Sequence, residues 1–149
     1  MLIRRDRAMT AVTIMLDVAF HAGRSETVSA GDLAERLGLA RRGMEPLLQT
    51  LSRAGLLESV RGPRGGYRLG RPRREIRLAE IVAIATTDDQ PTQDGPTGRL
   101  QTAVTDRLWS DLEDAAKTAL ATLTLEDLIR RAQAAGLKRP AAEPIMFAI

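Results

Sequence analysis

The sequence predicts a mainly α-helical protein that carries one small β-hairpin. Three observations lead to this fold class. Apolar residues recur at helical spacing in both halves of the chain. Residues 60–70 read Val-Arg-Gly-Pro-Arg-Gly-Gly-Tyr-Arg-Leu-Gly, which is typical of a tight turn between two short strands. Aromatic residues make up 3% of the chain, too few for the aromatic-rich strands of an all-β core.

The composition is that of a soluble globular protein. The 149 residues are 44% hydrophobic and 28% charged, which suits one core, or one small domain with an appendage. Apolar stretches such as residues 11–20 are too short to span a membrane. The arginine-rich N-terminus resembles a signal peptide, but Asp6 and Asp17 interrupt it. We therefore expect an amphipathic helix and a cytoplasmic protein.

The first predicted helix covers residues 7–22. Its apolar residues are spaced for a helix that is buried over much of its surface, and Gly23 is its expected end. These apolar positions are Met9, Val12, Ile14, Met15, Leu16, Val18, Ala19 and Phe20.

Two helices separated by a glycine are predicted next. Val28 is expected in a short strand, and Ser29 is a suitable N-cap for a helix over residues 30–37. Gly38 ends this helix, after which Leu39 is expected to pack inward.

The second helix of the pair runs to Ala54. Proline is tolerated in the first turn of a helix, so Pro46 predicts that regular helix begins near Gly43 or Met44. The apolar positions of this helix are spaced by three and four residues, at Met44, Leu47, Leu48 and Leu51.

A hairpin and a short helix complete the first half. Residues 56–60 are predicted as a strand, 61–66 as the turn and 67–69 as the return strand. Residues 78–85 are predicted as a short helix. Helix, glycine turn, helix and hairpin in this order are the pattern of a winged helix-turn-helix, with the hairpin as the wing.

The second half is predicted to contain a polar loop and a long helix. Residues 86–98 have almost no apolar content, which predicts a mobile loop. A helix of over twenty residues follows, and its apolar stripe needs a partner, for which a second copy of the chain is the economical choice. Thr124 is expected to cap a last helix over residues 125–135, closed by Gly136. The stripe consists of Leu100, Val104, Leu108, Leu112, Ala116, Ala119 and Leu123.

The two halves of the chain differ in charge. Residues 1–82 hold 15 arginines and 9 acidic residues, a net charge of +6, whereas residues 83–149 hold 7 basic and 10 acidic residues, a net charge of −3. A positive first half favours a polyanionic partner. We expect three parts: a winged helix-turn-helix DNA-binding domain over 1–85, a flexible loop over 86–98 and a helical dimerisation region over 99–149.

The second helix of the pair carries candidate DNA contacts. In a winged helix-turn-helix this helix enters the major groove, while the wing touches the backbone or the minor groove. Arg41 and Arg42 lie at its start, where arginine reaches phosphates and guanine edges. Glu45, one turn further on, either accepts from cytosine N4 or acts as a first-turn acid that complements the helix dipole.

Arginines on the wing are the other candidates. Arg61 and Arg64 flank the turn, and narrow minor grooves attract arginine electrostatically. The alternative is a solvated hairpin, and Tyr67 is expected to pack under the wing rather than stack on a base. Arg68 on the return strand and Ser29 before the first helix of the pair complete the candidate DNA-binding residues.

No catalytic constellation accompanies these residues. The sequence has no nucleophile motif and no phosphate-binding glycine loop of the Walker or dinucleotide type. His21, the single histidine, is expected to be structural. The absence of cysteine excludes disulfides, thiolate metal sites and cysteine-ligated iron–sulfur clusters. We therefore expect a protein that is not an enzyme and that has no cofactor or metal.

Four segments resemble the Rrf2 family of bacterial transcriptional regulators. These segments are residues 30–39, 44–57, 59–70 and 75–82. The Arg-Gly-Pro-x-Gly-Gly-Tyr wing is the most specific of the matching motifs. The resemblance implies a homodimer, a repressor or an activator, on a partly palindromic operator. It also implies that Glu45 reads a base and that Arg61 enters the minor groove.

The chain also departs from the family pattern at two places. Cluster-binding members of the family carry three cysteines between the short helix and the long one, whereas residues 86–99 have none, so no iron–sulfur cluster is expected. The serines that often open the recognition helix are replaced by Arg41 and Arg42, so the family's operator sequence cannot be carried over.

The sequence thus predicts a cytoplasmic homodimeric regulator, expected to be a repressor, that binds double-stranded DNA and has no membrane partner. The alternative is an adaptor that uses the winged helix to bind protein instead of DNA. The sequence leaves open whether a small-molecule effector binds.

Overall fold

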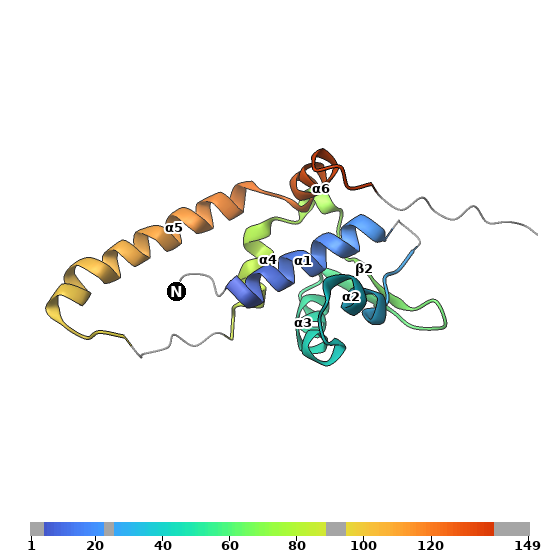
Figure 1. Ribbon diagram of the computed structural model, residues 1–149, viewed down its shortest axis with the longest axis horizontal. Helices are drawn as coiled ribbons and strands as arrows, with labels where there is room; N and C mark the ends of the chain where they lie inside the picture. Colours follow the sequence, from blue (N-terminus) through green and yellow to red (C-terminus); the bar gives the residue numbers. More distant parts are fainter. Residues whose placement is uncertain (1–4, 23–25, 89–94, 139–149) are drawn as a thin grey trace, which may run out of the picture.

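Short helices and a hairpin gather at one end of the molecule, and one long helix reaches away from them (Figure 1). The structure is a computed structural model in which residues 5–22, 26–88 and 95–138 are described. The long helix covers residues 99–122 and contains α5 (Asp106–Thr122), and the elements outside it form the part that we call the body. Within the described residues, no helix has both the length and the apolar character needed to cross a membrane.

Helix α1 (Arg5–His21) runs through the centre of the body. It confirms the first predicted helix, although its expected end at Gly23 lies outside the described residues. The Arg7 Nε donates a hydrogen bond of 2.6 Å to the carbonyl of Ala85, which fixes α1 against a later helix. Its fully buried side chains recur at helical spacing, as the sequence predicts. They are Ala8, Ala11, Ile14, Met15 and Val18.

Helix α2 (Ala30–Leu37) is bounded as predicted, but the turn after it differs in one respect. Gly38 ends the helix in the left-handed conformation, with φ +63°. The prediction that Leu39 packs inward is wrong, because its side chain is 39% exposed. The Leu39 N–H donates to the carbonyl of Ala34 at 3.0 Å, and this bond holds the residue in the surface turn between two helices.

Helix α3 (Arg41–Arg53) begins earlier than Pro46 suggested. The prediction of a start near Gly43 or Met44 is wrong, because the proline sits inside the helix, in its second turn. A proline there deprives the Arg42 carbonyl of its usual i+4 donor. Both Pro46 and Arg42 are exposed, so water can satisfy that carbonyl at little cost. The buried side of α3 is the predicted one: Met44, Leu47, Leu48 and Leu51.

The hairpin consists of β1 (Leu57–Val60) and β2 (Gly66–Leu69), paired antiparallel. Leu57 lies opposite Leu69 in the register. Val28 forms a bridge to Tyr67 through two backbone hydrogen bonds of 2.8 Å, which confirms the short strand expected there. The hairpin is therefore anchored to the segment that leads into α2.

Three further elements close the body: η1 (Arg73–Glu75), α4 (Leu78–Ala85) and α6 (Leu125–Ala134). Helix α4 has the predicted bounds. Helix α6 contributes Leu125 and Ile129 to the same core as α1 and α4, although it follows the long helix in the chain.

Backbone hydrogen bonds attach the start of α6 to the entry of α4. The Leu125 N–H donates to the Ile76 carbonyl at 3.0 Å, and the Leu78 N–H donates to the Leu123 carbonyl at 2.9 Å. Thr124 caps α6 as expected, in a reciprocal capping box with Asp127. The last helix is thus an integral part of the body.

The chain is helical from residue 99 to 122, which confirms a helix of over twenty residues. Its first part, η2 (Gln101–Thr105), is a π-helical turn that the sequence analysis did not predict. There the Thr105 hydroxyl donates to the backbone and side-chain oxygens of Gln101, at 3.1 and 2.9 Å. The mobile loop predicted over 86–98 includes residues 89–94, which lie outside the described residues.

Candidate nucleic-acid interface

Helix α3 presents a polar face on the side away from the core. Leucines and Met44 take the inner side, so the residues between them are exposed. The outer residues include three predicted candidates and one that the sequence analysis missed, Gln49. Its spacing of four residues from Glu45 was the signal that could have found it. The polar face consists of Arg41, Arg42, Glu45 and Gln49.

Two of these residues form a pair along the helix. The Arg41 Nε lies 3.7 Å from the Glu45 carboxylate, and the two side chains are 67% and 54% exposed. Such an exposed pair contributes little to stability, so both groups can turn to another partner at small cost. Arg42 makes no ion pair with any described residue.

The Ser29 hydroxyl is engaged within its own helix. It accepts a hydrogen bond of 3.0 Å from the Asp32 N–H and so caps α2, as predicted. Capping occupies the oxygen but leaves the hydroxyl proton available to an outside acceptor. The structure also places Ser29 beside the base of the wing, because its backbone adjoins Gly66.

Glycines shape the wing turn and its contact with the body. A side chain at Gly65 would meet the Val60 carbonyl oxygen at 2.5 Å, and one at Gly66 would meet the Val28 carbonyl oxygen at 2.4 Å. Both positions therefore require the absence of a Cβ. The Gly65 N–H donates to the Gly62 carbonyl at 2.9 Å and closes the turn.

Arg61 and Arg64 project from this turn into solvent. Both are exposed, and neither pairs with a carboxylate in the described part of the chain. The Thr27 hydroxyl donates a hydrogen bond of 2.7 Å to the Arg64 carbonyl, a contact that the sequence analysis missed. The turn is thus held to the body while its two guanidinium groups stay accessible.

Arg68 behaves differently from the turn arginines. Its Nε donates to the Glu58 carboxylate at 2.8 Å, across the hairpin. This hydrogen bond and the adjacent charge hold the pKa of Glu58 below its ordinary value and that of Arg68 above it. Part of the Arg68 charge is therefore neutralised within the wing.

The position of α2 depends on an ion pair that sequence reasoning did not single out. Arg36 donates to both oxygens of Asp17 on α1, at 2.7 and 2.9 Å. The Asp17 side chain is 9% exposed, and its hydrogen bond raises the pKa of Arg36. His21 lies 3.7 Å from the same carboxylate. This fork fixes α2, and with it the start of α3, against α1.

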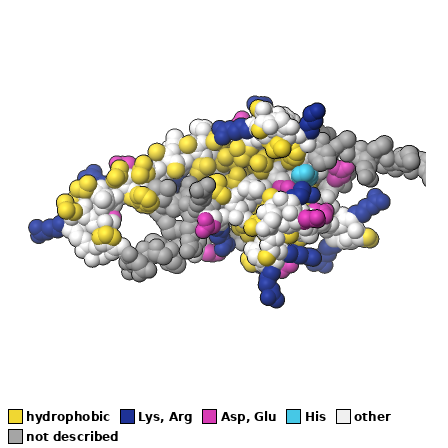
Figure 2. Space-filling view, in the orientation of Figure 1, with side chains coloured by type: hydrophobic (Ala, Val, Ile, Leu, Met, Phe, Trp, Pro, Cys, Tyr) yellow, Lys and Arg dark blue, Asp and Glu magenta, His cyan; other side chains and the backbone are white. Residues whose placement is uncertain are grey.

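Apolar side chains form the most continuous surface along the long helix. On the face shown in Figure 2, hydrophobic side chains run along α5, whereas basic side chains project from α3, the hairpin and α6, and also from the far end of the long helix. Among the described residues, no group of three or more histidines, aspartates and glutamates is arranged to hold a metal ion. A cluster held by cysteine thiolates does not fit this chain, which has no cysteine.

Capped α2, the α3 helix with its polar outer face and the glycine-built hairpin together define a winged helix-turn-helix protein. The family described as "Rrf2: Iron-dependent Transcriptional regulator" matches residues 5–131. The chain belongs to this family of transcriptional regulators, and it is not an enzyme.

Relatives and solved structures agree with this assignment. The chain is 38% identical over 122 residues to the "HTH-type transcriptional regulator IscR" of Photorhabdus laumondii, covering 80% of this chain and 74% of the relative. It is similar in structure to the IscR of T. potens, with TM-score 0.71, 30% identity and 90% of each chain covered. It is also similar to CymR, "the Global Cysteine Regulator of B. subtilis", with TM-score 0.69, 29% identity and coverage of 88% and 98%.

Proposed function

We propose that this protein is a cytoplasmic, homodimeric repressor that binds a partly palindromic DNA operator without an iron–sulfur cluster. The observation that carries the proposal is the pair of exposed wing arginines, Arg61 and Arg64, on a turn that is tied to the body. Accessible guanidinium groups on an anchored turn suit insertion beside phosphates or into a narrow minor groove.

The polar face of α3 supports reading of base edges. Arg41, Arg42, Glu45 and Gln49 are exposed on one helix whose opposite side is buried in the core. Arginine matches guanine, glutamate accepts from cytosine, and glutamine matches adenine in the major groove. Ser29 lies beside the wing, and Arg68 lies within it, on β2. Both are assigned to phosphate contacts, and the contact of Arg68 is expected to be the weaker because its guanidinium group is hydrogen-bonded to Glu58.

The homodimer is supported by the exposed stripe along the long helix. Leu100, Val104, Leu108 and Leu112 recur every four residues along one side of the helix, and the first, second and last of them are 80%, 57% and 44% exposed. Leu108 and Trp109 are also about half exposed. A matching stripe from a second copy would cover these residues, and the resulting two-fold axis would repeat the wing and α3 on a palindromic operator.

The wing is tested by substituting Arg61→Ala and Arg64→Ala together. Both changes remove exposed charges and leave the glycine turn intact, so the fold should be unaffected. We expect the operator mobility shift to be lost at about 0.1–0.2 M salt, and the slope of log affinity against log salt to fall by about one for each phosphate contact removed.

A matched control is Arg107→Ala, which removes an exposed arginine on α5 that pairs with no described residue. This variant should bind the operator as the parent does. An unchanged shift by the wing variant would refute the proposed role of the wing. If neither the parent chain nor either variant binds any DNA, and the chain captures a protein instead, the adaptor would be favoured.

A further inference from the structure

A cavity lies away from α3, on the side where α1 ends. It has a volume of about 800 Å³ and lies between the end of α1, the segment from β2 to η1, and α6. Apolar residues such as Ala19 and Leu69 form part of its wall. This volume is within the range of pockets that hold small organic ligands.

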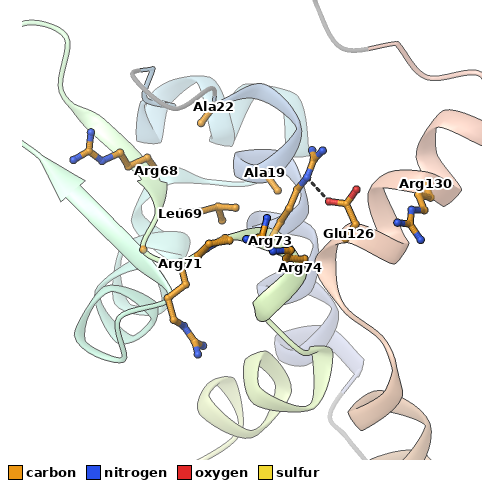
Figure 3. A pocket seen from close by; sticks show the side chains of 11 residues that line it. Ala19, Ala22, Arg68, Leu69, Arg71, Arg73, Arg74, Glu126 and Arg130 are labelled. Atoms are coloured by element: carbon orange, nitrogen blue, oxygen red, sulfur yellow. Dashed lines mark ion pairs between the residues drawn. The ribbon is translucent and has the colours of Figure 1, made fainter.

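Five arginines and one glutamate line this cavity, which we call the arginine cavity. Figure 3 shows Arg73 of η1 reaching Glu126 of α6, with which it forms an ion pair. The arginines come from two separate parts of the chain, residues 68–74 and helix α6, which the fold brings together. The charged lining residues are Arg68, Arg71, Arg73, Arg74, Arg130 and Glu126.

The arginines differ in how far their charge is already compensated. Arg68 pairs with Glu58 and Arg71 with Glu80, and in Figure 3 both guanidinium groups point away from the Arg73–Glu126 pair. Arg74 pairs with no described residue. Arg130, 71% exposed, has only a contact of 4.0 Å to Asp127.

The lining therefore has an excess of positive charge beside an apolar wall. Two guanidinium groups, those of Arg74 and Arg130, lack a close internal carboxylate, and a third is held by Glu126, which itself belongs to the lining. An incoming anion can compete with Glu126 for Arg73. Guanidinium forks bind phosphate oxygens in a bidentate way.

From this geometry we infer that the arginine cavity binds a small organic anion of charge two or more, such as a phosphate monoester. The anionic group lies among Arg73, Arg74 and Arg130, and the organic part lies against Ala19 and Leu69. This inference does not depend on whether the chain binds DNA. The cavity includes residues of the wing strand β2 and of α6, so its occupant contacts two parts of the body at once.

The test uses phenyl phosphate as the probe, with inorganic phosphate for comparison, on the full chain by calorimetry at constant ionic strength. Phenyl phosphate is expected to bind more tightly than inorganic phosphate because its ring buries apolar surface. The double variant R74Q/R130Q is expected to bind it at least about tenfold more weakly. The control R107Q, on α5, is expected to leave the affinity unchanged.

A second variant acts in the opposite direction. E126Q removes the carboxylate that competes for Arg73, so it should bind phenyl phosphate more tightly than the parent chain. Unfolding is monitored in parallel to confirm that each variant is folded. Equal affinity in R74Q/R130Q and R107Q, absence of binding to the parent chain, or weaker binding by E126Q would each overturn the inference. Weaker operator binding by R74Q/R130Q without any phenyl phosphate binding would assign these arginines to DNA phosphates instead.

Discussion

Apolar side chains are buried in the body but exposed on the long helix. In the body, leucine, isoleucine and methionine side chains from α1, α3, α4 and α6 meet in one core, and many of them have no exposed surface. In the long helix, from residue 99 to 122, no residue is buried, and the leucines at 100, 108 and 112 are exposed by amounts from 44% to 80%.

The same apolar periodicity on a helix can therefore serve either folding within one chain or association between chains. A stripe on α3 is satisfied within one chain, because α2, α4 and β1 pack against this helix. The stripe on α5 is satisfied only at its C-terminal end, where Leu120 and Leu123 pack against the core. Exposed stripes of this size on a single chain mark interaction surfaces. Stability should therefore reside in the body, and assembly in α5.

The largest expected effect is on assembly. In the proposed dimer, Leu108→Glu and Leu112→Glu together would place like charges on the two facing copies of α5, four in all. We expect the chain to become monomeric at micromolar concentration in analytical ultracentrifugation, with its winged body still folded by circular dichroism. Charge substitution on the opposite side of the helix, at the exposed Asp114→Lys, should leave the dimer intact. A double variant that stays dimeric would show that α5 is not the interface.

The next effect is on the stability of the body. Leu48 is fully buried on α3, so Leu48→Ala leaves a cavity and should lower the free energy of unfolding by about 2–5 kcal/mol. Leu100→Ala at the start of the long helix removes a side chain that is 80% exposed and should change the free energy of unfolding of the monomeric form by less than about 0.5 kcal/mol. Denaturant unfolding of both, in the monomeric background, measures the contrast. Equal losses would mean that α5 is part of the folding core.

The smallest effect concerns the junction between the two regions, where Thr124 and Asp127 cap α6. The hydrogen bond from the Thr124 N–H to the carboxylate lowers the pKa of Asp127, and the Thr124 hydroxyl adds to this. Because the folded-state pKa is depressed, the ionised cap stabilises the fold above the unfolded-state pKa, near 4, and this contribution is lost as the pH falls through the folded value.

The variant Asp127→Asn isolates this contribution. The difference in melting temperature between parent and variant should be constant above about pH 5. It should shrink as the pH falls below about 4. Thermal unfolding from pH 2.5 to 6 measures the difference, and the Glu58–Arg68 pair cancels because both chains contain it. A difference that stays constant to the lowest pH would show that the cap acts without its charge.

Much of the body follows from local sequence rules. The caps at Ser29 and Thr124, the glycine turn of the wing and the spacing of apolar residues each predict an element that the structure contains. The errors arise at positions where the surroundings compensate for what a local sequence rule predicts. Pro46 is tolerated inside α3 because the carbonyl that it deprives of a donor is exposed. Leu39 stays at the surface because a backbone hydrogen bond fixes its turn.

Some candidate sites can be predicted from the sequence, whereas others are formed by residues that only the fold brings together. The wing arginines lie in one turn and the candidates of α3 lie on one helix, so each of these groups is visible before the fold is known. The fork of Arg36 on Asp17 joins residues 19 positions apart, and the Arg73–Glu126 pair joins residues more than fifty apart. Contacts of this kind depend on how helices cross, which apolar spacing alone does not fix. The arginine cavity therefore becomes visible only in three dimensions.

The return of α6 to the body has a consequence for how the protein is made. Leu125 and Ile129 fill the core around α1. The Leu125 N–H donates a hydrogen bond to the carbonyl of Ile76, a residue just before the start of α4. Domains generally acquire their fold as they leave the ribosome, from the N-terminal end onward. Here the wing and α3 emerge first, yet their core stays incomplete until residue 129 has been added. Translation must thus pass through the whole of the long helix before any DNA-binding surface can be stably formed.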